Sequence, residues 1–326
     1  MRQAMAEAKL GDDVWGEDPT INRLQEVAAE RLAKDSALFV SSGTMGNLLG
    51  ILVSARSGQE IIADADSHTF LSETGGAAAL GGIQIMPVRT EAGIMTPEQV
   101  ADAIRVEDVH HPRTAAVTFE DTHNYHGGIA WPLAALRAAS DEAHRHGLSV
   151  HLDGARLFNA AVATGTDVRE IAACADTVTF CLSKGLAAPV GSVLAGPREK
   201  IDEARRWRKM LGGGMREIGM LGAAGLFALD NMVDRLQEDH GNARTLAEGM
   251  AEMEGINLDL PRVQTNLVVF TLDAMAPEAF LAECENRGVL GAQISRRQVR
   301  FVTHYGISAA DVQHALKSVA EVLGAA

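Results

Sequence analysis

The segment Asp176–Gly196 constrains the fold most strongly, because it places two apolar strands on either side of a short polar break. Val178, Phe180 and Leu182 recur at every second position, which is the period of a β-strand. The break is the tripeptide Ser-Lys-Gly at residues 183–185. Lysine is rarely buried without a partner, and burial lowers the pKa of an amine, which makes it a nucleophile able to form a Schiff base. On the tripeptide alone, a lysine in a surface loop is the simpler interpretation.

A second strand, within Ser149–Asn159, ends in the sequence Asp-Gly-Ala-Arg at residues 153–156. Open α/β sheets bind ligands at the carboxyl ends of their strands, although an Asp-Gly pair is most often a simple turn. Asp153 and Lys184 are separated by about one crossover connection, so their strands can be close in one sheet. An acid, a lysine and an arginine at such an edge suit pyridoxal 5'-phosphate. The lysine binds the cofactor, the acid keeps the pyridine nitrogen protonated, and Arg156 stabilises the phenolate oxygen.

A strand expected at residues 37–40 runs through Ser41–Thr44 into a helix expected at 45–55. The free backbone N–H groups and the dipole of such a helix start favour an anion. An ordinary strand-to-helix turn remains the alternative at Gly43 and Thr44.

Composition narrows the classes of partner. The chain has 326 residues, enough for about two domains, and a formal net charge of −14, which argues against nucleic acid or an anionic membrane surface as partner. No apolar run has the length of a membrane helix, and the first ten residues are not a signal peptide. Cys174, Cys181 and Cys284 form neither a metal pattern nor an even disulfide set, so we expect a cytoplasmic protein. We expect no metal site, since His110 and His111 have no carboxylate at ligand spacing.

Longer motifs carry a family resemblance. The chain resembles the low-specificity L-threonine aldolases, in the β-eliminating lyase group of fold-type-I pyridoxal-phosphate enzymes. The matching segments span most of the chain in the family's order: GDDVWGEDPTINRLQ (Gly11–Gln25), SSGTMGN (Ser41–Asn47), HLDGARLFNA (His151–Ala160), CLSKGLAAPVGS (Cys181–Ser192), RWRKMLGGGMR (Arg206–Arg216) and RLQEDHGNA (Arg235–Ala243).

The resemblance implies an α/β fold of the pyridoxal-phosphate-dependent transferase type. We expect a large cofactor-binding domain at residues 1–238, with a seven-stranded, mostly parallel sheet and helices on both faces. A small α+β domain should follow at residues 239–326. Further strands are expected at residues 60–63, 83–88, 115–119, 266–272 and 298–303, and helices at 1–10, 20–32, 132–146, 221–236, 242–253, 277–287 and 308–323.

The implied reaction is retro-aldol cleavage of L-threonine, L-allo-threonine and related β-hydroxy-α-amino acids to glycine and an aldehyde. One alternative is β-elimination from another amino acid on the same cofactor. Another is a cofactor-binding protein with little turnover. Met1 lies inside the region that matches the family's first helix, so the family's preceding segment with its substrate-binding serine would be missing, and we expect a weakened affinity for the amino acid.

The resemblance also assigns cofactor contacts. Lys184 would carry the cofactor beside Ser183, and Gly43 and Thr44 would contact it. In the family, the residues that match Lys209 and Arg216 come from a neighbouring subunit, so we expect a homotetramer built from two tight dimers, with shared active sites.

Four further residues would act near the substrate. His68 would stack on the cofactor ring, and His110 would approach the β-hydroxyl group. The base that takes the hydroxyl proton could be His68, His110 or a water molecule. Arg300 would hold the substrate carboxylate. Trp15 stands where the family usually has a tyrosine that lines the neighbouring subunit's pocket.

Overall fold

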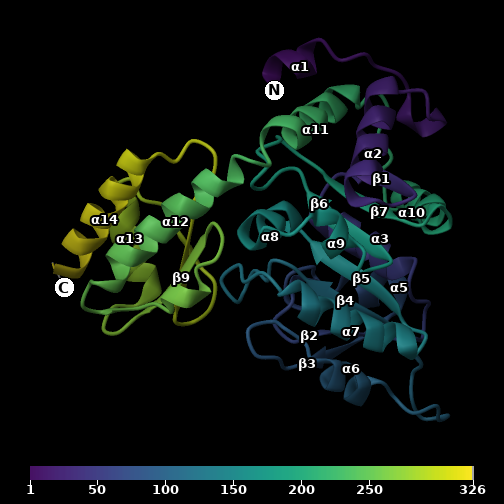
Figure 1. Ribbon diagram of the computed structural model, residues 1–326, viewed down its shortest axis with the longest axis horizontal. Helices are drawn as coiled ribbons and strands as arrows, with labels where there is room; N and C mark the ends of the chain where they lie inside the picture. Colours follow the sequence, from purple (N-terminus) through teal and green to yellow (C-terminus); the bar gives the residue numbers. More distant parts are fainter. Residues whose placement is uncertain (325–326) are drawn as a thin grey trace.

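A computed structural model describes residues 1–324, and its centre is a seven-stranded sheet (Figure 1). The strands are β1 (Ser36–Val40), β2 (Glu60–Asp64), β3 (Gln84–Val88), β4 (Thr114–Glu120), β5 (Ser149–Gly154), β6 (Thr177–Cys181) and β7 (Ser192–Gly196). Their order is β1-β7-β6-β5-β4-β2-β3, and only β7 runs antiparallel to its neighbours. The predicted seven-stranded, mostly parallel sheet is therefore confirmed.

Helices cover both faces of this sheet, because its strands are buried on both sides. The elements of the large domain are α1 (Arg2–Ala6), the 3-10 turn η1 (Asp13–Trp15), α2 (Pro19–Leu32), α3 (Gly43–Leu52), α4 (His68–Leu71), α5 (Gly76–Gly81), α6 (Pro97–Ala103), α7 (Leu133–Arg145), α8 (Leu157–Thr164), α9 (Val168–Ala172), α10 (Arg198–Met210) and α11 (Gly219–Asn231). Successive side chains of β1 face opposite helical layers of the domain. Phe39 packs in the core that includes α2, whereas Leu38 and Val40 pack against α3 and α10.

Local signals explain most helix starts. Asp18 caps α2 by accepting hydrogen bonds from the backbone N–H groups of Thr20 and Ile21. A capping box between Thr96 and Gln99 begins α6. The helix predicted at residues 1–10 is shorter, because α1 ends at Ala6. No helix within residues 1–324 has the length and apolar character needed to cross a membrane.

Helix α3 approaches the sheet closely because two glycines face the strands. A Cβ atom at Gly46 would lie 2.5 Å from Cγ2 of Thr179, and one at Gly50 would lie 2.2 Å from Cε1 of His151. Only a residue without a side chain permits such an approach. The amino end of α3 is thereby brought to the carboxyl ends of β5 and β6.

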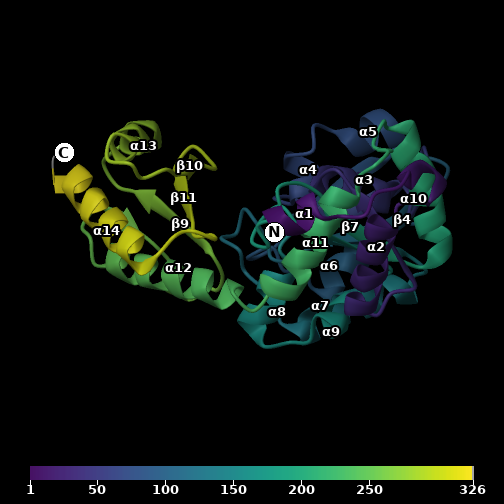
Figure 2. The same cartoon turned by 90° about the horizontal axis from the view of Figure 1, so that it is seen from above.

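A small domain lies to one side of the large domain (Figures 1 and 2). It contains α12 (Leu236–Ala251), β8 (Ile256–Asn257), the 3-10 turn η2 (Leu260–Arg262), β9 (Leu267–Leu272), α13 (Pro277–Glu285), β10 (Ala292–Gln293), β11 (Gln298–Val302) and α14 (Ala309–Gly324). The four strands form an antiparallel sheet in the order β10-β11-β9-β8. Its core is separate and includes the aromatic cluster of Phe270, Phe280 and Phe301.

Helix α12 connects the two cores. Its first residue, Leu236, packs in the large-domain core, whereas Ala243 and Leu246 belong to the small-domain core. The boundary predicted after residue 238 lies in the first turn of this helix. The helix predicted at 221–236 ends earlier, since α11 stops at Asn231.

Candidate active site

The carboxyl ends of β5 and β6 bring Asp153 and Lys184 to the same edge of the sheet. These strands are parallel neighbours, with Asp153 paired to Thr179. Asp153 is buried near the end of β5, and half-buried Lys184 follows β6. Lys184 lines a cavity of about 360 Å³ with Ser183, Arg156 and, from the small domain, Asn266 and Val302. The site therefore lies between the two domains.

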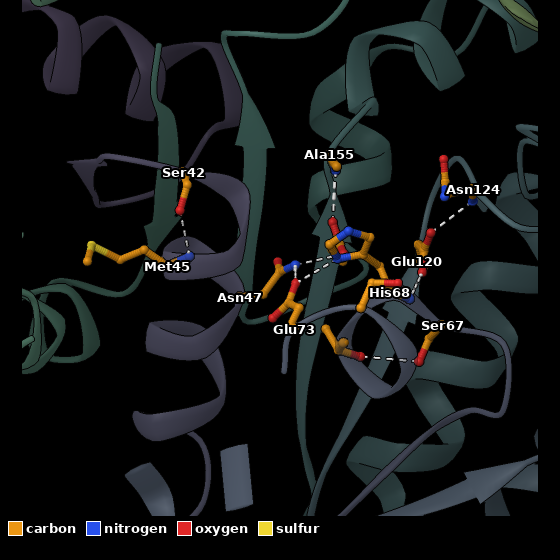
Figure 3. A network of polar contacts seen from close by, with 12 residues as sticks. Ser42, Met45, Asn47, Ser67, His68, Glu73, Glu120, Asn124 and Ala155 are labelled. Carbon is orange, nitrogen blue, oxygen red and sulfur yellow. Dashed lines mark hydrogen bonds and ion pairs between the residues drawn. The ribbon is translucent and has the colours of Figure 1, made fainter. Parts of the chain in front are cut away.

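A network of buried polar groups, which includes Asn47 and Glu73 (Figure 3), holds Asp153 in place. The amide nitrogen of Asn47 donates to Asp153 Oδ2 at 2.7 Å and to Glu73 Oε1 at 2.8 Å. The backbone N–H of Ala155 donates to Asp153 Oδ1 at 3.0 Å. His151 lies behind this network, with Nε2 3.3 Å from Asn47 Oδ1 and Nδ1 2.9 Å from Thr177 Oγ1. Because these hydrogen bonds fix the amide of Asn47, they also fix the carboxylate of Asp153.

His68 begins α4 and points toward the same group (Figure 3). Its Nδ1 lies 2.9 Å from Glu73 Oε1, and this hydrogen bond raises the pKa of the His68 imidazole above its ordinary value. Burial raises the pKa of the Glu73 carboxyl. The backbone N–H of His68 donates to Glu120 Oε2 at 2.6 Å, which ties α4 to the end of β4.

Two arginines from different domains meet at one amide oxygen. Asn124 Oδ1 accepts hydrogen bonds from Arg300 Nη1 at 2.7 Å and from Arg156 Nη1 at 3.2 Å. Arg300 lies on β11 of the small domain, and Arg156 follows β5 of the large domain. Burial, followed by the nearby charge of Arg300, lowers the pKa of Arg156 to about 10. Asn124 is itself anchored, since its backbone N–H donates to Glu120 Oε1 at 2.8 Å.

The amino end of α3 supplies the remaining side of the site. Ser42 caps the helix by accepting from the backbone N–H of Met45 at 3.1 Å, and Gly43 and Thr44 form the first turn. The first N–H groups of a helix lack intrahelical partners, and together with the dipole they favour a phosphate. The predicted strand, turn and helix are thus present at Gly43 and Thr44.

These residues fit pyridoxal phosphate. The donor set contains a cavity-lining amine at Lys184, a buried carboxylate at Asp153, a guanidinium at Arg156 and a helix start at Gly43. Asp153 is 2 % exposed, and within residues 1–324 it accepts from the Asn47 amide and the Ala155 backbone, neither of which is a cation. A buried carboxylate without a cation favours a positively charged partner such as a protonated pyridine nitrogen.

His110 is not brought to this edge of its own chain. It lies in the connection between α6 and β4, ahead of Thr114, and therefore at the amino end of a strand whose carboxyl end faces the site. Figure 1 shows this connection on the side of the large domain away from the small domain. The His110 side chain is 83 % exposed and contacts Asp108 at 2.6 Å. A role at the β-hydroxyl group would therefore have to be played in a neighbouring chain.

Trp15, Lys209 and Arg216 also lie outside the cavity, on a common surface. Trp15 is 74 % exposed. Arg216 forms an ion pair with Asp12, with Nε 2.7 Å from Oδ2, and its carbonyl accepts from the backbone N–H of Asp13. A Cβ atom at Gly214 would lie 3.0 Å from Lys209 Cδ, and one at Gly213 would lie 2.5 Å from the sulfur of Met45. This surface therefore borders the start of α3 from outside.

Several site residues were not predicted from the sequence. Asn47 lies within a matched motif but carried no separate signal, and Glu73 follows a short helix that no pattern predicted. Glu120 and Asn124 could have been found, because polar residues at the end of the strand at 115–119 meet the same criterion as Asp153. Asn266, His304 and Tyr305 line the cavity from the small domain, whose position the sequence did not predict.

The sheet order, the lysine after β6 and the acid on β5 define the class. The chain is an α/β enzyme that uses pyridoxal phosphate. A family model described as beta-eliminating lyase matches residues 1–273, and the chain belongs to this family.

Curated relatives agree with this assignment, and solved structures share the fold. The chain is 42% identical over 323 residues to the probable low-specificity L-threonine aldolase 2 of Arabidopsis thaliana, covering 97% of this chain and 91% of the relative. It is 42% identical over 317 residues to the low specificity L-threonine aldolase of Escherichia coli (strain K12), covering 94% and 90%. The crystal structure of a putative L-allo-threonine aldolase from Listeria monocytogenes superposes with a TM-score of 0.83 at 22% identity, covering 99% and 93%. A serine palmitoyltransferase from Sphingomonas wittichii gives 0.79 at 19% identity, covering 99% and 82%. These two structures are similar in fold.

Proposed function

We propose that this chain cleaves L-threonine, L-allo-threonine and related β-hydroxy-α-amino acids to glycine and an aldehyde. The observation that carries the proposal is the junction at Asn124, where Arg300 of the small domain meets Arg156, which lines the cavity with Lys184. An α-amino acid needs a bidentate partner for its carboxylate within reach of the cofactor, and Arg300 can provide it. The names of the relatives at 42% identity support this choice of reaction.

Each residue has a distinct task in this proposal. Bound pyridoxal phosphate withdraws electrons from the carbon that carries the amino group. Lys184 would hold the cofactor, Asp153 would keep a proton on its ring nitrogen, and Arg156 would stabilise its phenolate oxygen. The Asp153 carboxylate is oriented for this role, because Asn47 donates to one of its oxygens and the backbone of Ala155 donates to the other. Gly43 and Thr44 bind the phosphate, with Ser183 nearby.

His68 is the candidate base for the β-hydroxyl proton. When its Nδ1–H donates to Glu73, the lone pair of Nε2 is left to accept a proton, directly or through a water molecule. Glu73 also accepts a hydrogen bond from Asn47, and Asn47 in turn donates to Asp153. The position of His68 is therefore fixed relative to Asp153. General-base help of this kind contributes about 10²- to 10⁴-fold in rate.

The assembly and location are part of the proposal. Trp15, Lys209 and Arg216 form an exposed surface at the start of α3, as expected if they serve a neighbouring active site in a homotetramer. His110, at the other end of the sheet, would serve a further neighbour. The described part of the chain carries three buried free thiols, which suits a reducing cytoplasm.

The test is a product assay combined with mapping of the cofactor lysine. The purified protein should be yellow, and borohydride should fix the cofactor on the peptide that contains Lys184. It should form glycine and acetaldehyde from threonine in equal amounts, and Lys184→Ala should abolish both products. Lys200→Ala is the matched control. Lys200 lies on α10 and donates a hydrogen bond to Ser149 at the start of β5, outside the site. Release of ammonia and a keto acid would instead identify the β-elimination reaction.

A further inference from the structure

A cluster of four metal-ligating side chains lies beside the active site and has no part in the proposed reaction. Asp64 and Asp66 stand two residues apart at the carboxyl end of β2. His123 and His126 stand three residues apart in the loop that follows β4. Because β2 and β4 are parallel neighbours, their carboxyl ends bring the two pairs together. We call these four residues the Asp/His cluster.

The distances in the Asp/His cluster suit one small cation. Single ligand atoms of Asp64, His123 and His126 all lie within 4.8 Å of one another, whereas Asp66 stands outside this group of three. His123 Nε2 is 3.1 Å from Asp64 Oδ1, and His126 Nε2 is 3.5 Å from Asp66 Oδ2. Ligands at 2.0–2.1 Å from a tetrahedral zinc ion are about 3.3 Å apart, close to both separations.

Hydrogen bonding within the chain accounts for only half of the cluster. His123 and Asp64 are a hydrogen-bonded pair, which by itself would be an ordinary buried contact. His126 Nε2, however, is buried and has no hydrogen-bond partner among the described residues. Its ring is packed against that of His123, with centroids 4.6 Å apart, so it is held in this position. A buried ring nitrogen that lacks a partner and faces two carboxylates suits a bound cation.

Neighbouring hydrogen-bond donors fix the orientation of the Asp64 carboxylate, as a metal ligand requires. Thr90 Oγ1 donates to Asp64 Oδ2 at 2.6 Å, and the backbone N–H of Asp66 donates to Asp64 Oδ1 at 2.8 Å. Asp66 is half exposed, which gives a hydrated ion a route into the cluster. The nearby guanidinium of Arg262 is already paired with Asp259 at 2.9 Å and does not fill the place of the cation.

We propose that the Asp/His cluster binds one divalent transition-metal ion, with zinc as the ion of best fit. Two imidazole nitrogens and the Asp64 carboxylate match the ligand preferences of zinc, with the fourth position left to Asp66 or a water molecule. Imidazole ligands disfavour magnesium and calcium, which take oxygen ligands. The ion would be structural. It would clamp the loop that carries Asn124 onto the strand end that leads into His68, and so hold two active-site residues at a fixed separation.

The test is metal binding by the holoenzyme, measured by calorimetry with zinc chloride alone after treatment with a chelator. We expect one site per chain, and at least 100-fold weaker binding in both His126→Ala and Asp64→Asn. Cobalt at the same site should give the visible absorption of a tetrahedral ion, which a merely structural role of His126 would not produce. Zinc should also raise the melting temperature of the wild type and leave that of His126→Ala unchanged.

Surface histidines are the main competing source of binding, so His110→Ala and His314→Ala serve as controls and should bind zinc as the wild type does. If the His126→Ala chain folds poorly, Asp66→Asn on the exposed side gives the same comparison. Binding that is equal in wild type and His126→Ala, or lost only in the control variants, would overturn the proposal. These readouts do not depend on threonine cleavage, and they stand apart from the proposed reaction.

Discussion

At the scale of the residue, Asn124 is the side chain on which both halves of the active site depend. Its single amide oxygen accepts hydrogen bonds from Arg156 and Arg300, which come from different domains. Its backbone is fixed by Glu120, which also holds the start of α4. Asn124 therefore positions the arginine that we assign to the substrate carboxylate, without contacting the reacting bond.

Asn124→Ala should weaken substrate binding more than it slows the reaction. A lost hydrogen bond to a charged group is worth about 1.5–3 kcal/mol, so KM for threonine should rise by roughly 10- to 100-fold, while kcat changes less. Asn231→Ala is the control, since Asn231 is exposed and bonds only to a carbonyl of its own helix. Steady-state kinetics of the two variants give the comparison. An unchanged KM in Asn124→Ala would show that Arg300 does not need this partner.

At the scale of the element, the position of α3 decides the geometry of the cofactor site. Asn47, which bonds Asp153, lies on α3 between Gly46 and Gly50, the two glycines that touch the sheet. Any outward shift of this helix would lengthen the bond to Asp153. The close packing of α3 is thus a requirement of the site as well as of the core.

Gly50→Ala should be destabilising although alanine is the better helix former. The new methyl would lie 2.2 Å from the ring of His151, and such overpacking costs about 1–3 kcal/mol. Gly241→Ala in α12 is the matched control, because a Cβ atom there meets nothing within 4 Å. We expect it to raise the free energy of unfolding by about 0.5–1 kcal/mol. Urea unfolding measures both changes, and a Gly50→Ala chain as stable as wild type would contradict the packing argument.

His151, the residue of β5 against which Gly50 packs, makes the stability of the fold sensitive to acid. Burial lowers the pKa of His151 to about 4, from an ordinary value of 6.5, while the nearby charges of Asp153 and Lys200 oppose each other. The unfolded chain takes up this proton below pH 6.5 and the folded chain does not. The contribution of neutral His151 to stability is therefore complete above pH 6.5 and is lost as the pH falls from 6.5 to about 4.

The change in free energy of unfolding from His151 should reach about 3 kcal/mol over this range. His151→Asn keeps a polar side chain but cannot be protonated. Its stability should fall less steeply between pH 6.5 and 4.5, by up to about 1.4 kcal/mol per pH unit. Burial also lowers the pKa of His240 to about 4, so part of the slope should remain. Equal slopes in the variant and the wild type would show that His151 is not the group responsible.

At the scale of the whole molecule, one chain supplies a cavity and a separate exposed surface. Lys184, Arg156 and Arg300 belong to the cavity side, whereas Lys209 and Arg216 lie on the surface at the start of α3. If the exposed surface of one chain completes the cavity of a second chain, a pair of subunits related by two-fold symmetry contains two complete sites.

Mixed oligomers test this arrangement. Lys184→Ala and Arg216→Ala chains, each inactive alone, should regain up to about a quarter of wild-type activity when refolded together, since half of random dimers hold one intact site. The control pair, Lys184→Ala with Arg300→Ala, should regain nothing, because both residues belong to the same chain's site. Activity is followed as glycine formed from threonine. If the first pair also stays inactive, Arg216 serves the site of its own chain.

The sequence by itself determined which segments are strands and which residues stand at their ends. Alternation in residues 176–182 and 149–153 is a local property, because side chains of a strand alternate between faces whatever the rest of the chain does. Asp153, Arg156 and Lys184 could therefore be named as candidates before the fold was known, and the family resemblance added Arg300. Local capping chemistry likewise determined the start of α6.

Only the tertiary structure decided which of these residues meet. Strand direction separates His110 from Asn124, although both flank β4, because one precedes the strand and the other follows it. The contact of Arg300 with Asn124 joins two domains across 176 residues of sequence, and the Asp/His cluster joins Asp64 to His123 across 59. Such contacts depend on the order of strands and the docking of the small domain. These arise from burial of apolar surface over the whole chain, and no local pattern of residues records them.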